Sequence, residues 1–170
     1  MDKYITLLNY NVEVDRLVSM AKELDDQWEQ SYVMKYNNPD AKLERQEGLD
    51  HFKQNMNVDK NYWYIKKILD DFELPHNAAS PKFHWLAPNS VLETHVDEFT
   101  KCSINFILSS DTAPAPVTFE NQYSFNYKQA LLNTKVPHGV KNGPKARLVF
   151  RISYYGETYE ELSKRIKYKI

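Results

Sequence analysis

The sequence predicts a mainly β domain of the antiparallel sandwich or barrel type, with helices in its first half. Three observations support this fold class: the chain has 170 residues, 14% of them are aromatic, and its second half is a series of short β-prone runs. A chain of this length buries roughly two-thirds of the surface that its unfolded form exposes, which is enough for one core. Large aromatic side chains are favoured in strands. We therefore expect a single domain over residues 1–170.

The first 81 residues are predicted to contain a short strand at 4–8 and two helices that support the sheet. Apolar residues recur at three- and four-residue spacing from Val14 to Trp28 and again from Val58 to Phe72, as they do on one face of a helix. Pro75 is expected to end the second helix.

Residues 31–57 lack such periodicity. We expect an irregular segment there, with one or two helical turns over 41–47, and we hypothesise that it closes over the substrate as a flap.

Residues 82–156 form the predicted β core. Short runs separated by residues that favour turns are typical of an antiparallel sandwich or barrel. After them, Tyr159, Leu162 and Ile166 stand at helical spacing, so a helix over 157–170 is expected to end the chain on the outside. The eight expected strands are 82–86, 91–95, 103–108, 117–120, 123–127, 130–134, 138–140 and 146–155.

Composition argues against several classes of function. With 22 basic and 23 acidic side chains, nothing favours a nucleic acid or an anionic membrane as partner. No apolar stretch approaches the roughly 20 residues that cross a bilayer. The single cysteine, Cys102, excludes an intrachain disulfide and is expected to pack as a small apolar group. With no apolar run at the N-terminus, we expect a protein of the reducing cytoplasm.

Two histidines and an aspartate form a candidate metal site. His95 and Asp97 are two residues apart, so on a strand their side chains leave the same face, although Asp97 can instead begin the next loop. His138 stands at the edge of a predicted turn and is the best-placed third ligand. Two imidazoles and one carboxylate are the ligands of the facial iron(II) site of oxygenases.

A predicted hairpin links this site to an arginine. If Asn142 and Gly143 are the central residues of a two-residue hairpin, His138 pairs with Arg147, and directly opposed residues share a face. Arg147 would then point into the metal cavity and hold a carboxylate there. Arg151, in an Arg-x-Ser sequence with Ser153, is the alternative, but it lies roughly 13 Å farther along the strand.

The chain from 82 to 155 resembles the iron(II)/2-oxoglutarate-dependent dioxygenases, most closely the small prolyl-hydroxylase and aspartyl/asparaginyl β-hydroxylase-type members. The matching residues are Leu86-Ala87-Pro88, His95-x-Asp97, His138 and Arg147. The resemblance implies a double-stranded β-helix (jelly roll) with the helices packed outside one sheet. It also implies Fe(II), O₂ and 2-oxoglutarate, which is decarboxylated to succinate and CO₂ while a C–H bond is usually hydroxylated. Asn105 is implied to touch the co-substrate or the substrate.

Simpler interpretations of each residue compete with this one. Each histidine, arginine or aspartate can be an ordinary strand or turn residue, and only their joint spacing favours a site. His84 can line the cavity or stand exposed, and His51 and His76 are expected at the surface.

At the level of function, the alternatives are a cupin-like metal-binding jelly roll that acts as an isomerase or lyase and a non-catalytic binding module. Arg147 discriminates against the first and the intact ligand set against the second. The expected partner is a small molecule or a peptide or protein side chain, and the sequence assigns no oligomeric state.

Overall fold

The computed structural model describes residues 3–36, 43–109 and 116–170. It contains three α-helices and eleven strands in these ranges. The helices are α1 (Val14–Glu23), α2 (Trp63–Asp71) and α3 (Tyr159–Arg165). The strands are β1 (Ile5–Leu7), β2 (Glu29–Tyr36), β3 (Leu43–Asn55), β4 (Ala79–Leu86), β5 (Val91–Val96), β6 (Cys102–Ile107), β7 (Val117–Phe119), β8 (Tyr123–Phe125), β9 (Gln129–Leu132), β10 (His138–Lys141) and β11 (Arg147–Tyr154).

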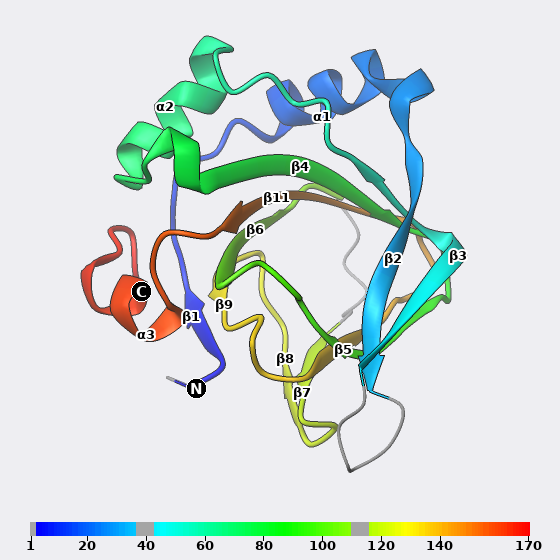
Figure 1. Cartoon of the computed structure of the whole chain (residues 1–170). Coiled ribbons are helices and arrows are strands. Elements are labelled where there is room, and N and C mark those ends of the chain that lie inside the picture. Colours follow the sequence, from blue (N-terminus) through cyan, green and yellow to red (C-terminus); the bar gives the residue numbers. More distant parts are fainter. Residues whose placement is uncertain (1–2, 37–42, 110–115) are drawn as a thin grey trace.

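The strands form two antiparallel layers. Their hydrogen-bonded order is β1-β9-β6-β11-β4-β3-β2-β5-β10-β7-β8. Figure 1 shows that this order turns over on itself, so that β1, β9, β6, β11 and β4 lie opposite β5, β10, β7 and β8, with β2 and β3 joining the layers at one side. From β4 to β11 the chain passes back and forth between the layers. This alternation is the double-stranded β-helix, or jelly roll, and the predicted fold class is confirmed.

The main hydrophobic core lies outside this pair of layers, beneath the helices. Alternate residues of β4, β6 and β11, such as Phe83, Phe106 and Phe150, are buried against α1, α2 and α3. Helices α1 and α2 cover this outer face in Figure 1. The periodic stripes that predicted the helices are the faces that they bury, with Leu17 in α1 and Ile65 and Ile68 in α2 fully enclosed.

The helices are shorter than predicted. The first ends at Glu23 and is followed by a 3₁₀ turn at Asp25–Gln27, and the second begins only at Trp63. The third starts at a capping box, in which the Thr158 hydroxyl accepts from the Glu161 amide and the Glu161 carboxylate accepts from the Thr158 amide.

The prediction for residues 31–57 was wrong in its secondary structure. Residues 43–47 belong to β3 rather than to helical turns, and residues 41–42 lie outside the described residues. Strand β3 pairs with β4 from Phe52 to Asn55, and β2 pairs with β5 at Met34 and Lys35. The segment therefore bridges the two layers, and its closure over a substrate stays a prediction.

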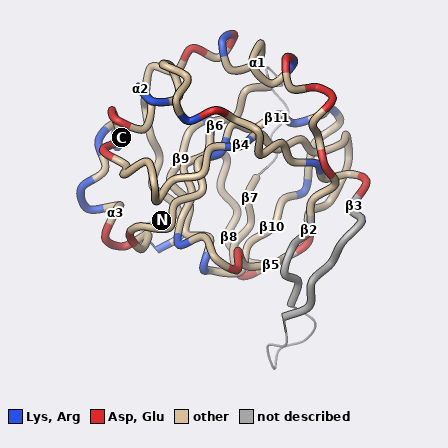
Figure 2. The backbone as a smooth tube through the Cα atoms, turned by 45° about the horizontal axis from the view of Figure 1, so that its top comes forward, with Lys and Arg blue, Asp and Glu red and all other residues tan. Residues whose placement is uncertain are grey.

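Charged side chains are mixed over the described surface. Figure 2 shows basic and acidic residues interleaved along the helices and loops, in keeping with a net charge of −1. None of the helices in the described part of the chain has the length and apolar character that a bilayer span requires.

Candidate metal centre

Two histidines from neighbouring strands face each other between the layers. Strand β10 pairs with β5 so that His138 lies opposite His95, and their ring centroids are 4.5 Å apart. Both residues are buried, at 5% and 4% exposure. Gly139 allows this close pairing, because a Cβ at that position would lie 2.7 Å from the Leu92 carbonyl oxygen. The glycine next to His138 is thus required by strand packing.

Backbone carbonyls orient both imidazoles. The Nδ1 of His95 lies 2.7 Å from the Glu93 oxygen, and the Nδ1 of His138 lies 2.8 Å from the Val136 oxygen. Because a carbonyl only accepts hydrogen bonds, Nδ1 carries the proton in each ring and Nε2 keeps its lone pair. Burial lowers the pKa of His95 to about 4 and also lowers the pKa of His138. Neutral imidazoles with a free Nε2 are the form that binds metals.

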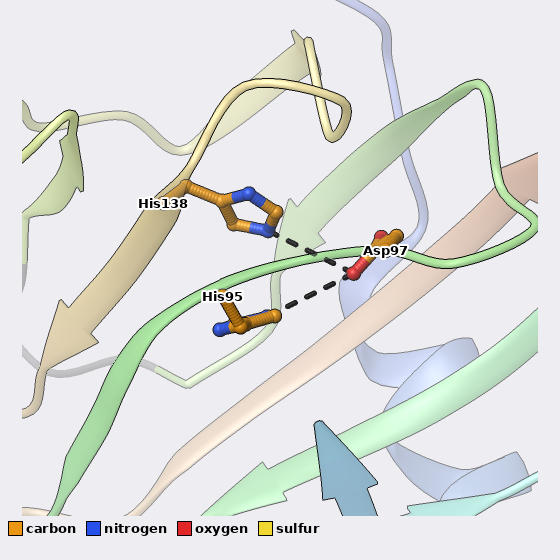
Figure 3. Close-up of side chains that lie close together, drawn as sticks. All are labelled: His95, Asp97 and His138. Atoms are coloured by element: carbon orange, nitrogen blue, oxygen red, sulfur yellow. Dashed lines mark ion pairs between the residues drawn. The ribbon is translucent and has the colours of Figure 1, made fainter. Parts of the chain in front are cut away.

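Asp97 completes the cluster from the loop that follows β5. Its Oδ1 is 3.7 Å from Nε2 of His95 and 3.9 Å from Nε2 of His138. Figure 3 shows the two rings turned toward this carboxylate. The backbone N–H of Asp97 donates to the Thr134 carbonyl at 3.1 Å, which fixes the start of the loop.

Arg151 controls the charge of this carboxylate. Burial by itself would raise the pKa of Asp97, but the charge of Arg151, with which Asp97 forms an ion pair, acts against burial, and the pKa lies well below its ordinary value. Asp97 is therefore ionised, with Oδ2 on the guanidinium and Oδ1 toward the histidines.

This donor set suits a transition metal. One ligand atom from each of His95, Asp97 and His138 lies within 4.8 Å of the others, so the three side chains can converge on one ion. Two neutral imidazole nitrogens and one carboxylate oxygen, all oriented by second hydrogen bonds, fit a facial site with open positions on the side away from the protein ligands.

The cluster lies in the wall of a cavity of about 320 Å³ between the layers. The four residues predicted to bind the co-substrate, Asn105, Arg147, Arg151 and Ser153, all line it. They come from β6 and β11, on the face opposite to the one that the helices cover. The structure therefore brings together every residue that the sequence singled out for the site.

The hairpin that led to Arg147 does not exist. Strand β10 pairs with β5 and β7, whereas β11 pairs with β4 and β6, so His138 and Arg147 belong to opposite layers. Asn142 is buried and crosses between the layers, with its amide donating to the carbonyls of Ala87 at 2.8 Å and Lys145 at 3.0 Å. The two residues face one cavity because the layers face each other, and not because their strands pair.

The two arginines have different surroundings. Arg147 pairs with Leu86 on the neighbouring strand and lies over the Tyr127 ring, with its Cζ 5.7 Å from the ring centroid. Arg151 is bound to Asp97, and its Nε donates to the Ser153 hydroxyl at 3.2 Å. Asn105 donates from Nδ2 to the Tyr127 hydroxyl at 3.2 Å. Arg151 and Ser153 therefore form the expected contact, but Arg151 is also bound to Asp97 of the metal cluster.

Sequence reasoning assigned no role to Lys82 and left the place of His84 undecided. Lys82 and His84 both line the cavity from β4. The burial pattern explains the difficulty, because Phe83 between them faces the helices and is fully buried. A polar–apolar alternation is ordinarily read as solvent on the polar side, whereas here the polar side is the cavity.

The fold and the cluster define a jelly-roll protein with a two-histidine, one-carboxylate group able to hold a metal ion. No family model matches the chain, and no curated protein matches its sequence. Among solved structures it is similar to the DMSP lyase DddQ from Ruegeria pomeroyi, with 11% identity, 89% of this chain and 67% of that chain covered, and a TM-score of 0.48.

It is also similar to the Cnp3 cupin domain of Schizosaccharomyces pombe, with 11% identity, 76% and 84% of the two chains covered, and a TM-score of 0.43. A third similar structure is the polyketide cyclase RemF from Streptomyces resistomycificus, with 12% identity, 62% and 66% covered, and a TM-score of 0.41. Likenesses at this level carry nothing about activity, so the fold rests on the strand order of the chain itself.

Proposed function

We propose that the protein is an Fe(II)/2-oxoglutarate-dependent oxygenase that hydroxylates a small molecule or a protein side chain. The observation that carries the proposal is the meeting of His95, Asp97 and His138 with Arg147 in one cavity. The ligand set is suited to Fe(II), and the buried guanidinium is suited to a carboxylate.

The reaction balances with the proposed co-substrates. One oxygen atom of O₂ enters succinate as 2-oxoglutarate loses CO₂, and the other enters the hydroxyl group of the product. Bound iron supplies the activation of O₂ for this two-electron oxidation. The chain supplies the ligands, the anchor for 2-oxoglutarate and an enclosed cavity.

Arg147 is the better anchor for the distal carboxylate of 2-oxoglutarate. Three carbon atoms separate the two carboxylates of this molecule, so an anchor must lie away from the metal. Arg151 touches Asp97, a proposed metal ligand, whereas Arg147 begins strand β11 four residues earlier, roughly 13 Å away along the strand. Tyr127 and Asn105 lie beside the path between these positions and are proposed to contact the co-substrate.

The environment of Arg147 supports a bound anion. Phe52, Leu86 and Leu92 are each at most 8% exposed and form an apolar cluster at this end of the cavity. Arg147 itself is only 6% exposed, and low exposure to water strengthens the attraction of a guanidinium for a carboxylate. An isomerase or lyase of the cupin type that works without 2-oxoglutarate has no need of an arginine here, so we rank that alternative second.

Anaerobic titration tests the proposal. Fe(II) and 2-oxoglutarate together are expected to give weak visible absorption in the wild-type protein, and admission of O₂ is expected to yield succinate. Arg147→Met should keep Fe(II) binding but weaken 2-oxoglutarate binding at least tenfold, because a charge-assisted pair is lost. Arg16→Met, at an arginine of α1 that does not line the cavity, is the matched control. Fe(II) binding with no effect of 2-oxoglutarate would favour the cupin-type alternative.

A further inference from the structure

Lys82 is a buried cation that the proposed reaction does not use. It is 8% exposed, lines the cavity, and makes no hydrogen bond or ion pair with any described residue. Strand pairing places it directly opposite Arg151, so two positive side chains stand side by side on the cavity wall. Like charges in directly opposed positions destabilise a sheet, and an unpaired buried ammonium is costlier still.

The charged residues of the cavity leave one positive charge in excess. Among the described residues that line it, three are cationic, Lys82, Arg147 and Arg151, and two are acidic, Asp97 and Glu98. A divalent metal and doubly charged 2-oxoglutarate cancel each other, so one positive charge remains after both are bound. Burial and Arg151 lower the pKa of Lys82 to about 8 although Asp97 acts in the opposite direction, and this value still leaves Lys82 largely protonated at neutral pH.

Other polar atoms near Lys82 are also unsatisfied. Asn105 pairs with Arg151 on the other side of β11, and its Oδ1 has no hydrogen-bond partner among the described residues. The same is true of the Ser103 hydroxyl, one alternation along β6. Buried polar atoms ordinarily find partners. Asn105 lines the cavity and its Oδ1 is an acceptor, so it is suited to a donor group of a ligand, whereas Ser103 does not line the cavity.

Large apolar side chains surround the mouth of the cavity at the same end. Met56 follows Asn55, the residue paired with Phe83, so it lies beside Lys82. The amide of Lys101 donates to the Tyr154 carbonyl at 2.9 Å, which brings the loop that carries Phe99 next to Tyr155. These three rim residues, Met56, Phe99 and Tyr155, line the cavity but are 53%, 71% and 37% exposed. Exposed apolar side chains at a cavity mouth mark a binding surface.

We propose, on the basis of the proposed function, that the substrate is a carboxylic acid with a bulky apolar group. Its carboxylate pairs with Lys82, and its apolar group lies on Met56, Phe99 and Tyr155. The substrate enters at this end, while 2-oxoglutarate occupies the closed end at Arg147. The substrate thus binds Lys82 beside the apolar rim residues, and 2-oxoglutarate binds Arg147 beside the apolar cluster of Phe52, Leu86 and Leu92.

The test is binding of 3-phenylpropanoate and of its neutral amide, measured by calorimetry on the full chain with and without Fe(II) under anaerobic conditions. The acid is expected to bind and the amide to bind at least tenfold more weakly. Lys82→Met should weaken binding of the acid at least tenfold, and Lys82→Arg should retain most of this binding. Phe99→Ala should weaken binding of the acid severalfold. Lys53→Met, at an exposed lysine of β3, is the matched control.

The variants separate this inference from the proposed function. If Lys82→Met weakens 2-oxoglutarate and leaves 3-phenylpropanoate unchanged, Lys82 is the co-substrate anchor and the inference is overturned. Equal binding of acid and amide also overturns it. If the acid depends on Lys82 while 2-oxoglutarate does not bind at all, the acid site stands and the oxygenase proposal fails. Lys82→Met removes an unpaired buried charge, so it is expected to fold, and its thermal unfolding checks this.

Discussion

At the scale of single residues, hydrogen bonds to the backbone decide the chemistry of the site. Each histidine of the cluster is fixed by a carbonyl two residues before it in the chain, Glu93 for His95 and Val136 for His138. The same local geometry therefore presents both Nε2 atoms to Asp97. The tautomer and the orientation of each imidazole are therefore fixed by a residue of the same short segment, and not by a distant one.

Lys82 gives a prediction about stability and pH. Its pKa is about 8 in the folded chain and 10.5 ordinarily, so the folded state disfavours the charged form. Because the folded pKa is the lower one, the full cost is present below pH 8 and disappears as pH rises toward 10.5. Metal-free Lys82→Met is expected to be more stable than wild type by about 3 kcal/mol at pH 7 and nearly equal to it above pH 10.5.

Urea unfolding with a chelator present, at pH 7 and at pH 10.5, measures this difference. The comparison between the two proteins removes the contribution of all other groups that titrate in the same range. A difference that stays constant with pH would show that Lys82 keeps its ordinary pKa in the folded chain.

At the scale of elements, the pairing of β10 with β5 is what makes a metal centre from two separate histidines. Gly139 lies between the paired positions and against the Leu92 carbonyl. Gly139→Ala is expected to push the strands apart, to destabilise the fold by about 1–3 kcal/mol, and to weaken metal binding although every ligand is retained. Metal titration and urea unfolding measure the two effects, with Lys141→Ala on the exposed end of β10 as control. Unchanged metal affinity would mean that the strands adapt without moving His138.

Asn142 is the second residue that holds elements together. Its side-chain amide donates to the carbonyls of Ala87 and Lys145, and its backbone amide donates to the Ser90 carbonyl at 2.8 Å. Asn142→Ala removes these side-chain hydrogen bonds from a buried position, and at about 1 kcal/mol for each bond a loss of about 2 kcal/mol is expected in urea unfolding. Asn11→Ala, at an exposed position, should change stability by less than about 0.5 kcal/mol. A similar effect of both changes would argue that the amide contacts contribute little.

At the scale of the whole molecule, the jelly roll divides its burial between two spaces. The apolar core lies between the helices and the outer face of one layer, while the space between the layers holds the polar cavity. Smaller apolar clusters close that inner space, one around Phe119 and Leu132 and one around Phe52 and Leu92. Apolar burial beneath the helices therefore stabilises the fold, while the space between the layers contains the polar site.

Metal binding should therefore stabilise the whole fold. A ligand that binds only the folded chain adds about 2.7 kcal/mol at one hundred times its dissociation constant. Anaerobic Fe(II) is expected to raise the unfolding temperature of the wild type, and His138→Ala and Asp97→Ala should abolish the rise. Thermal unfolding at several metal concentrations measures it. An equal rise in these variants would place the bound metal elsewhere.

The sequence by itself determined the local features of this protein. Short β-prone runs and turn residues located all eight core strands to within a few residues, because alternation and turn chemistry are properties of neighbouring residues. The ligand candidates His95, Asp97 and His138 followed from residue type and spacing. The stripes on the helices also indicated the faces that they bury.

Only the tertiary structure decided which strands pair and which face of the sheet meets the cavity. Asn142-Gly143 is a strong local signal for a hairpin, yet β10 and β11 lie in opposite layers, because pairing with β5 and β4 satisfies their backbones there. Residues 31–57 carry no periodic pattern, and pairing with β4 and β5 makes residues 31–36 and 43–55 into strands. The sequence assigned no role to Lys82, since alternation gives the face of a side chain but not what covers that face.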